Sequence, residues 1–244
     1  MTWFPPAVTL GANGVEAMVV ADPVEPVSER TRVRRHPERG VYDRDAIHRI
    51  IDEAVICHVG LVVTGQPLVL PTSHGRRGEN LYLHGAVAST LLRSMAQGVP
   101  VCATFTLLDG IVLARSIYNH SMNYRSVVVV GQGVDVRERE EKLLALEAIA
   151  EHILPGRWQD ARPPNEGELK STRVLRLSLV EASAKVREGP PSDDPEDMSL
   201  AVWAGVLPTA LRMGTPQPAP ELLPDSALPD YVARRVRALS GALP

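Results

Sequence analysis

The sequence is poor in cysteine and in aromatic residues. Its 244 residues include two cysteines and two phenylalanines, and aromatic side chains make up only 4% of the chain. Cys57 and Cys102 both lie in apolar runs, where reduced core cysteines are usual, so we expect no disulfide framework and a cytoplasmic protein. With so few aromatic side chains, the core must be mainly aliphatic.

Several classes of protein have no signature here. No uninterrupted apolar run approaches the ~18 residues that suggest a membrane span. The first ten residues place no lysine or arginine ahead of an apolar segment, so no secretory signal is predicted. The net charge of -3 argues against general nucleic-acid binding, which usually leaves a basic footprint. We therefore expect neither a membrane nor a nucleic acid as a partner.

The common catalytic motifs are absent as well. There is no Walker A sequence and no GxSxG, so neither a nucleoside-triphosphate loop nor a serine hydrolase is predicted. The seven histidines are scattered without an HxxxH or HExxH pair, and we expect no metal-ion site. An axial haem ligand needs only one histidine, so haem remains an alternative.

The hydrophobic pattern predicts short strands joined by hairpins. Asp43 can cap a helix whose isoleucines recur at helical spacing, and two strands at 57–64 and 67–72 flank a Gly65-Gln66 turn. A polar loop is expected at 73–80. Asp109-Gly110 is a strong hairpin signal between strands at 101–108 and 111–118. Further strands are predicted at 81–83, 124–131, 174–180 and 184–187, and helices at 86–97, 138–154 and 231–239.

Hairpins imply antiparallel pairing, so the fold class is α+β, an antiparallel β-barrel with flanking helices. Three regions are predicted: an N-terminal arm at 1–40, a central domain at 41–208 and a proline-rich tail with a short helix at 209–244. The arm is expected to be irregular. Alternatively, Trp3 and Phe4 wrap a partner subunit.

The strongest candidate for an anion site is the strand-turn-helix segment at 81–93. Gly85 would let backbone amides approach an anion, and Ser89 and Arg93 lie one helical turn apart on the same face. An ordinary tight strand-to-helix turn is the alternative. A second polar group, at 116–126, comes directly before a buried strand. It could supply donors to the edge of a planar ligand, or simply form a turn.

Four segments together resemble one family. They are VYDRDAIHRIIDEAVICHVGLV, QPLVLPTSHGRRGENLYLHGAVASTLLR, LLDGIVLARSIYNHSMNYRSVVVVG, and SAKVREGPP followed by VWAGVLP. In order and spacing they resemble the flavin-binding branch of the pyridoxamine 5′-phosphate oxidase-like superfamily, related to nitroimidazole-resistance proteins. The resemblance covers residues 41–208. It implies a homodimeric split β-barrel that holds FMN at the subunit interface.

The resemblance also implies which residues contact FMN. The YLHG-x-x-x-S-x-x-x-R segment would hold the phosphate, the PT pair would lie beside the isoalloxazine, and the NYRS segment would lie along the flavin. The tryptophan of WAGVLP would approach the flavin, across the dimer. The residues so implied are Pro71, Thr72, Tyr82, His84, Gly85, Ala86, Ser89, Arg93, Asn123, Tyr124, Arg125, Ser126 and Trp203.

The catalytic residue is not identified by the sequence. His74 follows Thr72 by two residues and is a candidate, because a histidine near the flavin acts in nitroimidazole-reducing relatives; a surface-loop histidine is the alternative. The function expected is an FMN-dependent oxidoreductase acting on a small molecule. The alternatives are a non-catalytic flavin-binding or flavin-sensing protein, and a haem- or deazaflavin-binding member of the superfamily. The C-terminal signature of true pyridoxamine oxidases is not recognisable, which argues against vitamin B6 synthesis.

Overall fold

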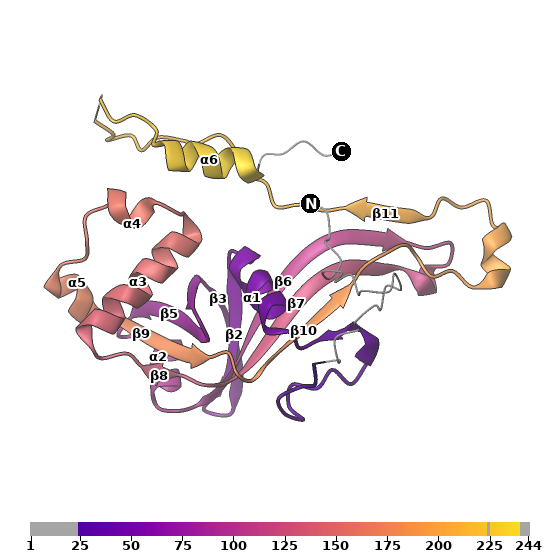
Figure 1. Cartoon of the computed structure of the whole chain (residues 1–244), viewed down its shortest axis with the longest axis horizontal. Coiled ribbons are helices and arrows are strands. Elements are labelled where there is room, and N and C mark those ends of the chain that lie inside the picture. The colour runs from indigo at the N-terminus through magenta and orange to yellow at the C-terminus, as the bar shows by residue number, and fades with distance from the viewer. Residues whose placement is uncertain (1–23, 224, 240–244) are drawn as a thin grey trace, which may run out of the picture.

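The computed structural model describes residues 24–223 and 225–239, which form two antiparallel sheets with helices on their outer sides (Figure 1). The helices are α1 (Arg44–Glu53), α2 (Thr90–Ala96), α3 (Arg139–Ile153), α4 (Arg157–Asp160), α5 (Glu166–Ser171) and α6 (Asp230–Leu239). The strands are β1 (Gly40–Val41), β2 (Cys57–Val63), β3 (Gln66–Thr72), β4 (His74–Arg77), β5 (Asn80–Ala86), β6 (Pro100–Leu113), β7 (Ser121–Gln132), β8 (Val134–Asp135), β9 (Thr172–Ser178), β10 (Ala182–Arg187) and β11 (Gly205–Pro208). Short 3-10 turns lie at Pro37–Arg39, Ile117–Asn119 and Pro195–Ser199.

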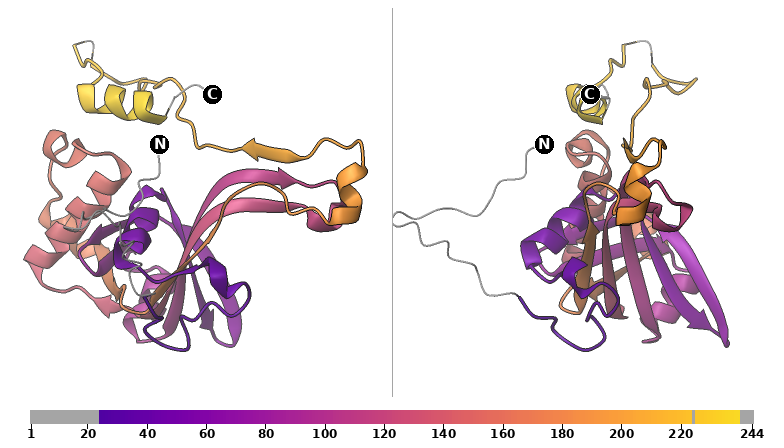
Figure 2. Two further views of the ribbon diagram at one scale, coloured as in Figure 1. Left: turned by 45° about the vertical axis from the view of Figure 1, so that its right-hand side comes forward. Right: turned by 90° about the vertical axis from the view of Figure 1, so that its right-hand side faces the viewer.

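The larger sheet has the strand order β1-β10-β7-β6-β2-β3, and β11 pairs with the second half of β6. Its two longest strands, β6 and β7, extend well beyond the other strands as a long arm, with β11 beside it (Figure 2). The smaller sheet has the order β4-β5-β9-β8 and lies under α3. All strand pairings among the described residues are antiparallel, which confirms the predicted α+β class.

The main core is aliphatic, as the composition predicts. Alternation along β2 and β6 places Val59, Ala103 and Phe105 on the inner face, where none of them is exposed to solvent. Helix α1 covers this core with Ile47, Ile50 and Ile51. The Asp43 carboxylate accepts from the Ala46 N–H at 2.8 Å, so the predicted helix cap is confirmed.

A predicted loop and a predicted hairpin turn both lie within strands instead. His74–Arg77 was expected to be part of a polar loop, but it forms β4 and pairs with β5. Gly75 is what makes this possible, since an added Cβ would lie 2.5 Å from the Ala148 carbonyl carbon of α3. The glycine that signals a loop in the sequence here permits close packing of strand against helix.

The predicted hairpin at Asp109-Gly110 is wrong, because β6 is one strand of 14 residues. Asp109 is a bulge at which the register with β7 shifts. A bulge and a hairpin turn use the same residue types, because both need a local departure from the extended backbone. The true connection to β7 is the segment 114–120.

Smaller departures concern element boundaries and faces. The first hairpin turns at Thr64-Gly65, one residue earlier than expected, with positive φ at both positions. Helix α2 starts at Thr90 and leaves Val87 outside it, although Gly98 ends the turn with φ +81° as expected. Helix α3 buries Ala145 and Ile149, whereas Ile153 at its end is 44% exposed. The short elements β1, β8, β11, α4 and α5 were not predicted as separate elements.

The described segments before and after the central domain pack in different ways. Residues 24–39 lie against the domain, with Thr31 buried and the Ser28 hydroxyl donating to Glu181 at 2.6 Å. Trp3 and Phe4, proposed to wrap a partner, lie outside the described residues. The tail at 209–223 leads to α6 close to α3 and α4 (Figure 1). No described helix has the length and apolar character needed to cross a membrane.

Candidate functional site

The predicted phosphate segment runs from the end of β5 into α2. Ser89 is the N-cap of α2, and its hydroxyl accepts the Leu92 N–H at 3.4 Å. The preceding turn is fixed by backbone hydrogen bonds from Ser89 N–H to the Ala86 carbonyl and from Val87 N–H to the Ser171 carbonyl. The segment is therefore a rigid corner between the two sheets, with Ala86 exposed at its outer side.

Two side chains at this corner have unused hydrogen-bonding capacity. The Nδ1 atom of His84 is shielded from solvent and has no hydrogen-bond partner, and burial lowers the pKa of this imidazole. The Arg93 guanidinium is exposed, and among the described residues it makes one weak hydrogen bond, of 3.4 Å, to the Thr90 hydroxyl. A buried polar atom without a partner and an arginine without an acidic partner are features of a site that completes its hydrogen bonds with a ligand.

Tyr82 belongs to a different environment. Its side chain is 5% exposed and packs beneath α3 with Ala145 and Ile149. Its hydroxyl donates to Glu141 at 3.3 Å, and burial raises the pKa of the phenol. In this structure Tyr82 supports α3 and Gly85 packs on Leu92, while Ala86 and Arg93 are exposed.

The polar group at the start of β7 is largely occupied by internal bonds. Asn123 is 9% exposed, accepts a hydrogen bond from Arg187 and donates to the Gly189 carbonyl at 3.1 Å. The Ser126 hydroxyl donates to the Lys185 carbonyl at 3.2 Å, while Tyr124 is half-buried. These contacts bind β7 to β10 and to the loop that follows β10.

Arg125 is held by two carboxylates. Its guanidinium donates to Asp109 at 2.8 and 3.0 Å and to Glu53 at 2.5 and 2.8 Å. These bonds raise the pKa of Arg125 further above its usual value. Four of the five guanidinium N–H groups are thus used within the chain. No local pattern indicates these ion pairs, because Glu53 and Asp109 lie 72 and 16 residues away from Arg125 in the chain.

Three predicted residues lie at edges of the larger sheet. Pro71 and Thr72 end β3, the edge strand, where the Thr72 hydroxyl donates to the Ser73 carbonyl at 3.2 Å. Trp203 precedes β11 and is 63% exposed. Its ring folds back over Gly205, where an added Cβ would lie 2.9 Å from the indole.

His74 is a core residue. It has no solvent exposure, its Nε2–H donates to the Ile51 carbonyl at 3.0 Å, and its ring meets Phe105 edge-on at 4.8 Å. The surface-loop alternative is therefore wrong. Burial lowers the pKa of His74 to about 4, so the imidazole is neutral at pH 7. Whether it takes part in chemistry stays a prediction, although no described cavity is lined by it.

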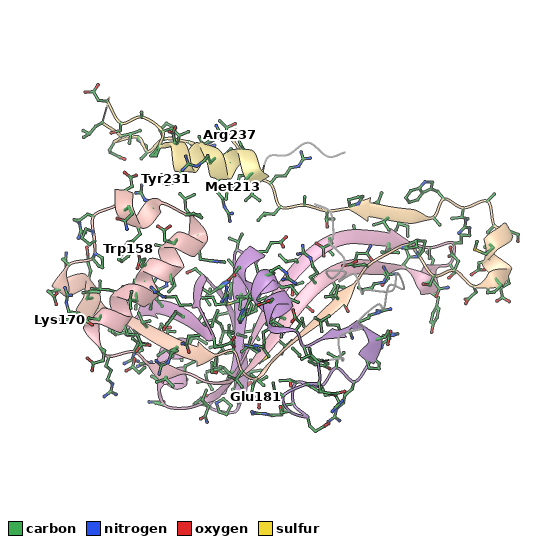
Figure 3. All side chains as sticks on the ribbon, viewed as in Figure 1. Trp158, Lys170, Glu181, Met213, Tyr231 and Arg237 are labelled. Atoms are coloured by element: carbon green, nitrogen blue, oxygen red, sulfur yellow. The ribbon has the colours of Figure 1, made fainter. Side chains whose placement is uncertain are left out.

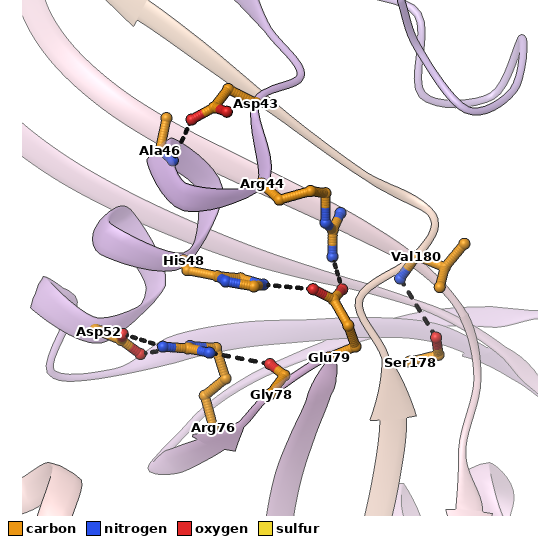
Figure 4. Close-up of polar contacts among 10 residues, drawn as sticks. All are labelled: Asp43, Arg44, Ala46, His48, Asp52, Arg76, Gly78, Glu79, Ser178 and Val180. Atoms are coloured by element: carbon orange, nitrogen blue, oxygen red, sulfur yellow. Dashed lines mark hydrogen bonds and ion pairs between the residues drawn. The ribbon is translucent and has the colours of Figure 1, made fainter. Parts of the chain in front are cut away.

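Ion pairs near His74 fix α1 against the smaller sheet (Figure 4). Arg76 of β4 donates to both oxygens of Asp52, at 2.5 and 2.8 Å. Glu79, between β4 and β5, bonds to Arg44 and lies 3.1 Å from the Nε2 atom of His48. Burial lowers the pKa of His48, with the positive charge of Arg76 adding to the effect.

Within one chain the predicted site residues fall into separate groups. The His84–Arg93 corner lies at the end of β5 in the smaller sheet, while 123–126 and Trp203 belong to the arm of the larger sheet. No hydrogen bond among the described residues joins these groups. The described residues also contain no cluster of three or more potential metal ligands.

Comparison with known proteins identifies the family. Residues 43–186, more than half of the chain, match the sequence model of the family described as pyridoxamine 5′-phosphate oxidase. The chain belongs to this family. The match confirms the resemblance read from the four sequence segments, and the fold is the split barrel of that family.

Three solved structures give the likeness in more detail. The flavocytochrome Anf3 from Azotobacter vinelandii is 37% identical with a TM-score of 0.82, over 86% of this chain and 98% of that one. The FAD and heme binding protein from Mycobacterium smegmatis is 32% identical with a TM-score of 0.77, over 83% and 98%. A putative 5-nitroimidazole antibiotic resistance protein from Bacteroides thetaiotaomicron is 26% identical with a TM-score of 0.51, over 60% and 86%. No curated protein matches the chain.

Proposed function

We propose that this protein is a flavin-dependent oxidoreductase that acts on a small molecule. The observation that carries the proposal is the corner between β5 and α2. Among the described residues, Arg93 has no acidic partner there, and the buried Nδ1 atom of His84 has no hydrogen-bond partner. Arg93 would bind the flavin phosphate, and His84 would hydrogen-bond to a neighbouring oxygen. When bound, the flavin supplies the hydride or electron chemistry, while the chain positions it and shields it from water.

The set of residues at this corner suits FMN, and the phosphate nearest the riboflavin of FAD would make the same contacts. FAD is considered as a ligand because a relative with 32% identity is described as an FAD and heme binding protein. Liquid chromatography of the flavin released by heating the purified protein distinguishes the two. We expect an absorption band near ~450 nm that dithionite bleaches, and a protein without this band would contradict the proposal.

Variants of the corner test the site itself. We expect Arg93→Gln to lower flavin affinity about 10-fold or more, because a charge-assisted hydrogen bond contributes about 1.5–3 kcal/mol. Arg49→Gln is the matched control, since Arg49 is an exposed arginine of α1 for which no side-chain partner is described. Equal flavin content in the two variants would exclude the phosphate assignment. Reduction of the bound flavin by NADH or NADPH separates the enzyme from a non-catalytic flavin-binding protein.

A homodimer would complete this site. The outer face of the larger sheet carries His58, Val62, Val69, Thr104 and Val128, which neighbour one another across β3, β2, β6 and β7. Val62, Val69 and Val128 are 57%, 61% and 39% exposed, and none of the five residues is an aspartate, glutamate, lysine or arginine. An uncharged, partly apolar sheet face of this kind suits a second copy of the chain. The partner's arm would then bring Trp203 or the 123–126 segment toward the flavin.

Haem is a second cofactor to consider, because the relatives with 37% and 32% identity are a flavocytochrome and an FAD and heme binding protein. His120 is the histidine whose geometry fits an axial ligand best. Its Nδ1 atom lies 2.8 Å from the Ser116 carbonyl, which can only accept, so Nδ1 carries the proton and Nε2 keeps a free lone pair. Ile117 and Tyr118, 86% and 93% exposed, offer apolar surface for a porphyrin beside it.

Three of the other histidines fit haem less well. His74 and His152 already use Nε2 for backbone carbonyls of α1. His36 has the same Nδ1 arrangement as His120, with Glu38 at 3.0 Å, but its neighbours in the chain are charged. We therefore propose His120 as the residue that would hold the iron. A Soret band in the purified protein is the expected observation, and its absence after growth with a haem precursor would leave the flavin proposal standing alone.

A further inference from the structure

A cavity of about 810 Å³ lies where the C-terminal tail crosses the larger sheet. Its walls come from the end of α1, the middle of β6, residues 209–212 and the last turn of α6. Of the residues predicted to contact flavin, Arg125 alone lines it, and no histidine, cysteine or methionine does, so it offers haem no axial ligand. We call it the tail cavity.

The tail cavity sits at a gap in the sheet. On one edge of β6, β2 pairs with Val101–Thr104 and β11 pairs with Gly110–Leu113. The Thr209 backbone N–H and hydroxyl bond to the carbonyls of Asp109 and Leu108, at 3.1 and 2.5 Å. Between these pairings, residues 105–107 have no strand partner on this edge within the described chain. The gap leaves room for a ligand beside the open edge.

Some charged side chains around the cavity have partners of opposite charge, whereas for others no such partner is described. Glu53 and Asp109 bind Arg125, and Asp52 binds Arg76. Arg212 and Arg235 line the same space, and no hydrogen bond or ion pair to either is described. The Nε atom of Arg235 is also shielded from solvent without an acceptor. A buried guanidinium N–H without an acceptor is unfavourable, and an anion entering the cavity would supply one.

The rest of the lining is mainly apolar. Ile56, Leu107, Leu108, Leu211 and Leu239 contribute to it, and Leu211 is 62% exposed. Two arginines above an aliphatic wall match a molecule with an apolar body and one acidic end. We propose that the tail cavity binds an amphipathic organic anion, whose carboxylate or phosphate group is held by Arg235 and Arg212.

Calorimetric titration of the purified full-length protein with decanoate tests this proposal, with decanol as the uncharged probe of equal length. We expect decanoate to bind at least ~10-fold more tightly than decanol. Arg235→Gln should weaken decanoate binding ~10-fold. Arg234→Gln and Arg237→Gln are matched controls, because these arginines are exposed on the same helix, and Figure 3 labels Arg237 on its outer side. Both should bind decanoate within ~2-fold of the original protein.

A second variant distinguishes loss of the binding site from misfolding of the tail. Ala238→Trp keeps every charge and places a large ring in the cavity, so it should abolish decanoate binding while the melting temperature is retained. Equal affinities for decanoate and decanol, equal affinities in the Arg235 and Arg234 variants, or no binding at millimolar decanoate would each overturn the proposal. None of these results depends on flavin or haem.

Discussion

The rings of His74 and His152 lie in tilted contact, with their centroids 4.2 Å apart, and together they bind the end of α1. The Nε2–H of His74 donates to the Ile51 carbonyl at 3.0 Å, and that of His152 donates to the Ala54 carbonyl at 2.8 Å. The last carbonyls of a helix have no partner within the helix, and these two imidazoles supply one. One histidine comes from β4 and the other from α3, so the pair joins three elements. Burial, together with the nearby ring of His152, disfavours protonation of His74.

This pair should make stability depend on pH. Burial lowers the pKa of His74 to about 4 and also lowers that of His152, so both rings take up protons more readily in the unfolded chain. The contribution of this pair to the free energy of unfolding should therefore be fully present above pH ~6.5, fall as the pH drops toward 4, and level off below. His74 alone should account for about 3 kcal/mol of that loss. Urea denaturation at several pH values measures it.

His74→Gln isolates the contribution of this residue. Glutamine can donate to the Ile51 carbonyl but does not titrate, so the dependence between pH 6.5 and 4 should become shallower. His36→Gln changes a histidine that is exposed at the surface and should leave the dependence unaltered. If the His74 variant keeps the original slope, the buried pair is not its source.

Gly75→Ala should destabilise the fold severely. The added Cβ would lie 2.5 Å from backbone atoms of Ala148 and Ile149 in α3, which cannot move aside as a side chain could. We expect a loss of about 3 kcal/mol or more in the free energy of unfolding, measured by urea denaturation. Gly78→Ala is the control, because that site has φ +55° but open space around it, and should cost only about 1 kcal/mol. Similar losses in the two variants would show that α3 does not pack on β4 this closely.

Ser89→Ala should act first on α2. The hydroxyl caps the helix through the Leu92 N–H, so its loss should cost about 1 kcal/mol of stability even without flavin. Ser89→Asn keeps a capping acceptor and should restore the stability of the flavin-free protein. Thermal denaturation of both variants, with and without flavin, separates the cap from any phosphate contact. A flavin-free Ser89→Ala protein of unchanged stability would contradict the cap.

His120→Ala should alter any haem bound by the protein. Loss of the axial ligand should shift the Soret band and lower haem content at least ~10-fold, read by absorption spectroscopy of the purified protein. His58→Ala is the control, because His58 is also exposed but lies on the outer face of the sheet. If the His58 variant loses haem and the His120 variant keeps it, the ligand assignment moves to His58.

Val128→Arg should dissociate a dimer formed through the outer face of the larger sheet. In a symmetric interface the new positive charge would face an uncharged surface or its own copy, which should raise the dissociation constant at least ~10-fold. Light scattering after size-exclusion chromatography measures the mass, and flavin content should fall with it. Val180→Arg is the control, since Val180 is exposed between β9 and β10. Equal masses for both variants would place the interface elsewhere.

The sequence alone determined the family, the antiparallel α+β class and most strands and helices. Alternation along β2 and β7 and the isoleucine spacing of α1 are local patterns, so they survive in any tertiary context. The corner at 81–93 was also readable, because a glycine between a strand and a capped helix is a local signal. The FMN assignment and the dimer depend on a resemblance, and they stay predictions.

Only the tertiary structure decided what several of these residues do. Asp109-Gly110 has the composition of a hairpin turn, yet pairing with β7 on one side and β11 on the other holds it as a bulge inside β6. Arg125 looked free to bind a ligand, but Glu53 from a distant helix occupies it. His74 looked like a loop residue until α3 covered it. In each case the deciding contact joins residues far apart in the chain, and no local pattern encodes such a contact.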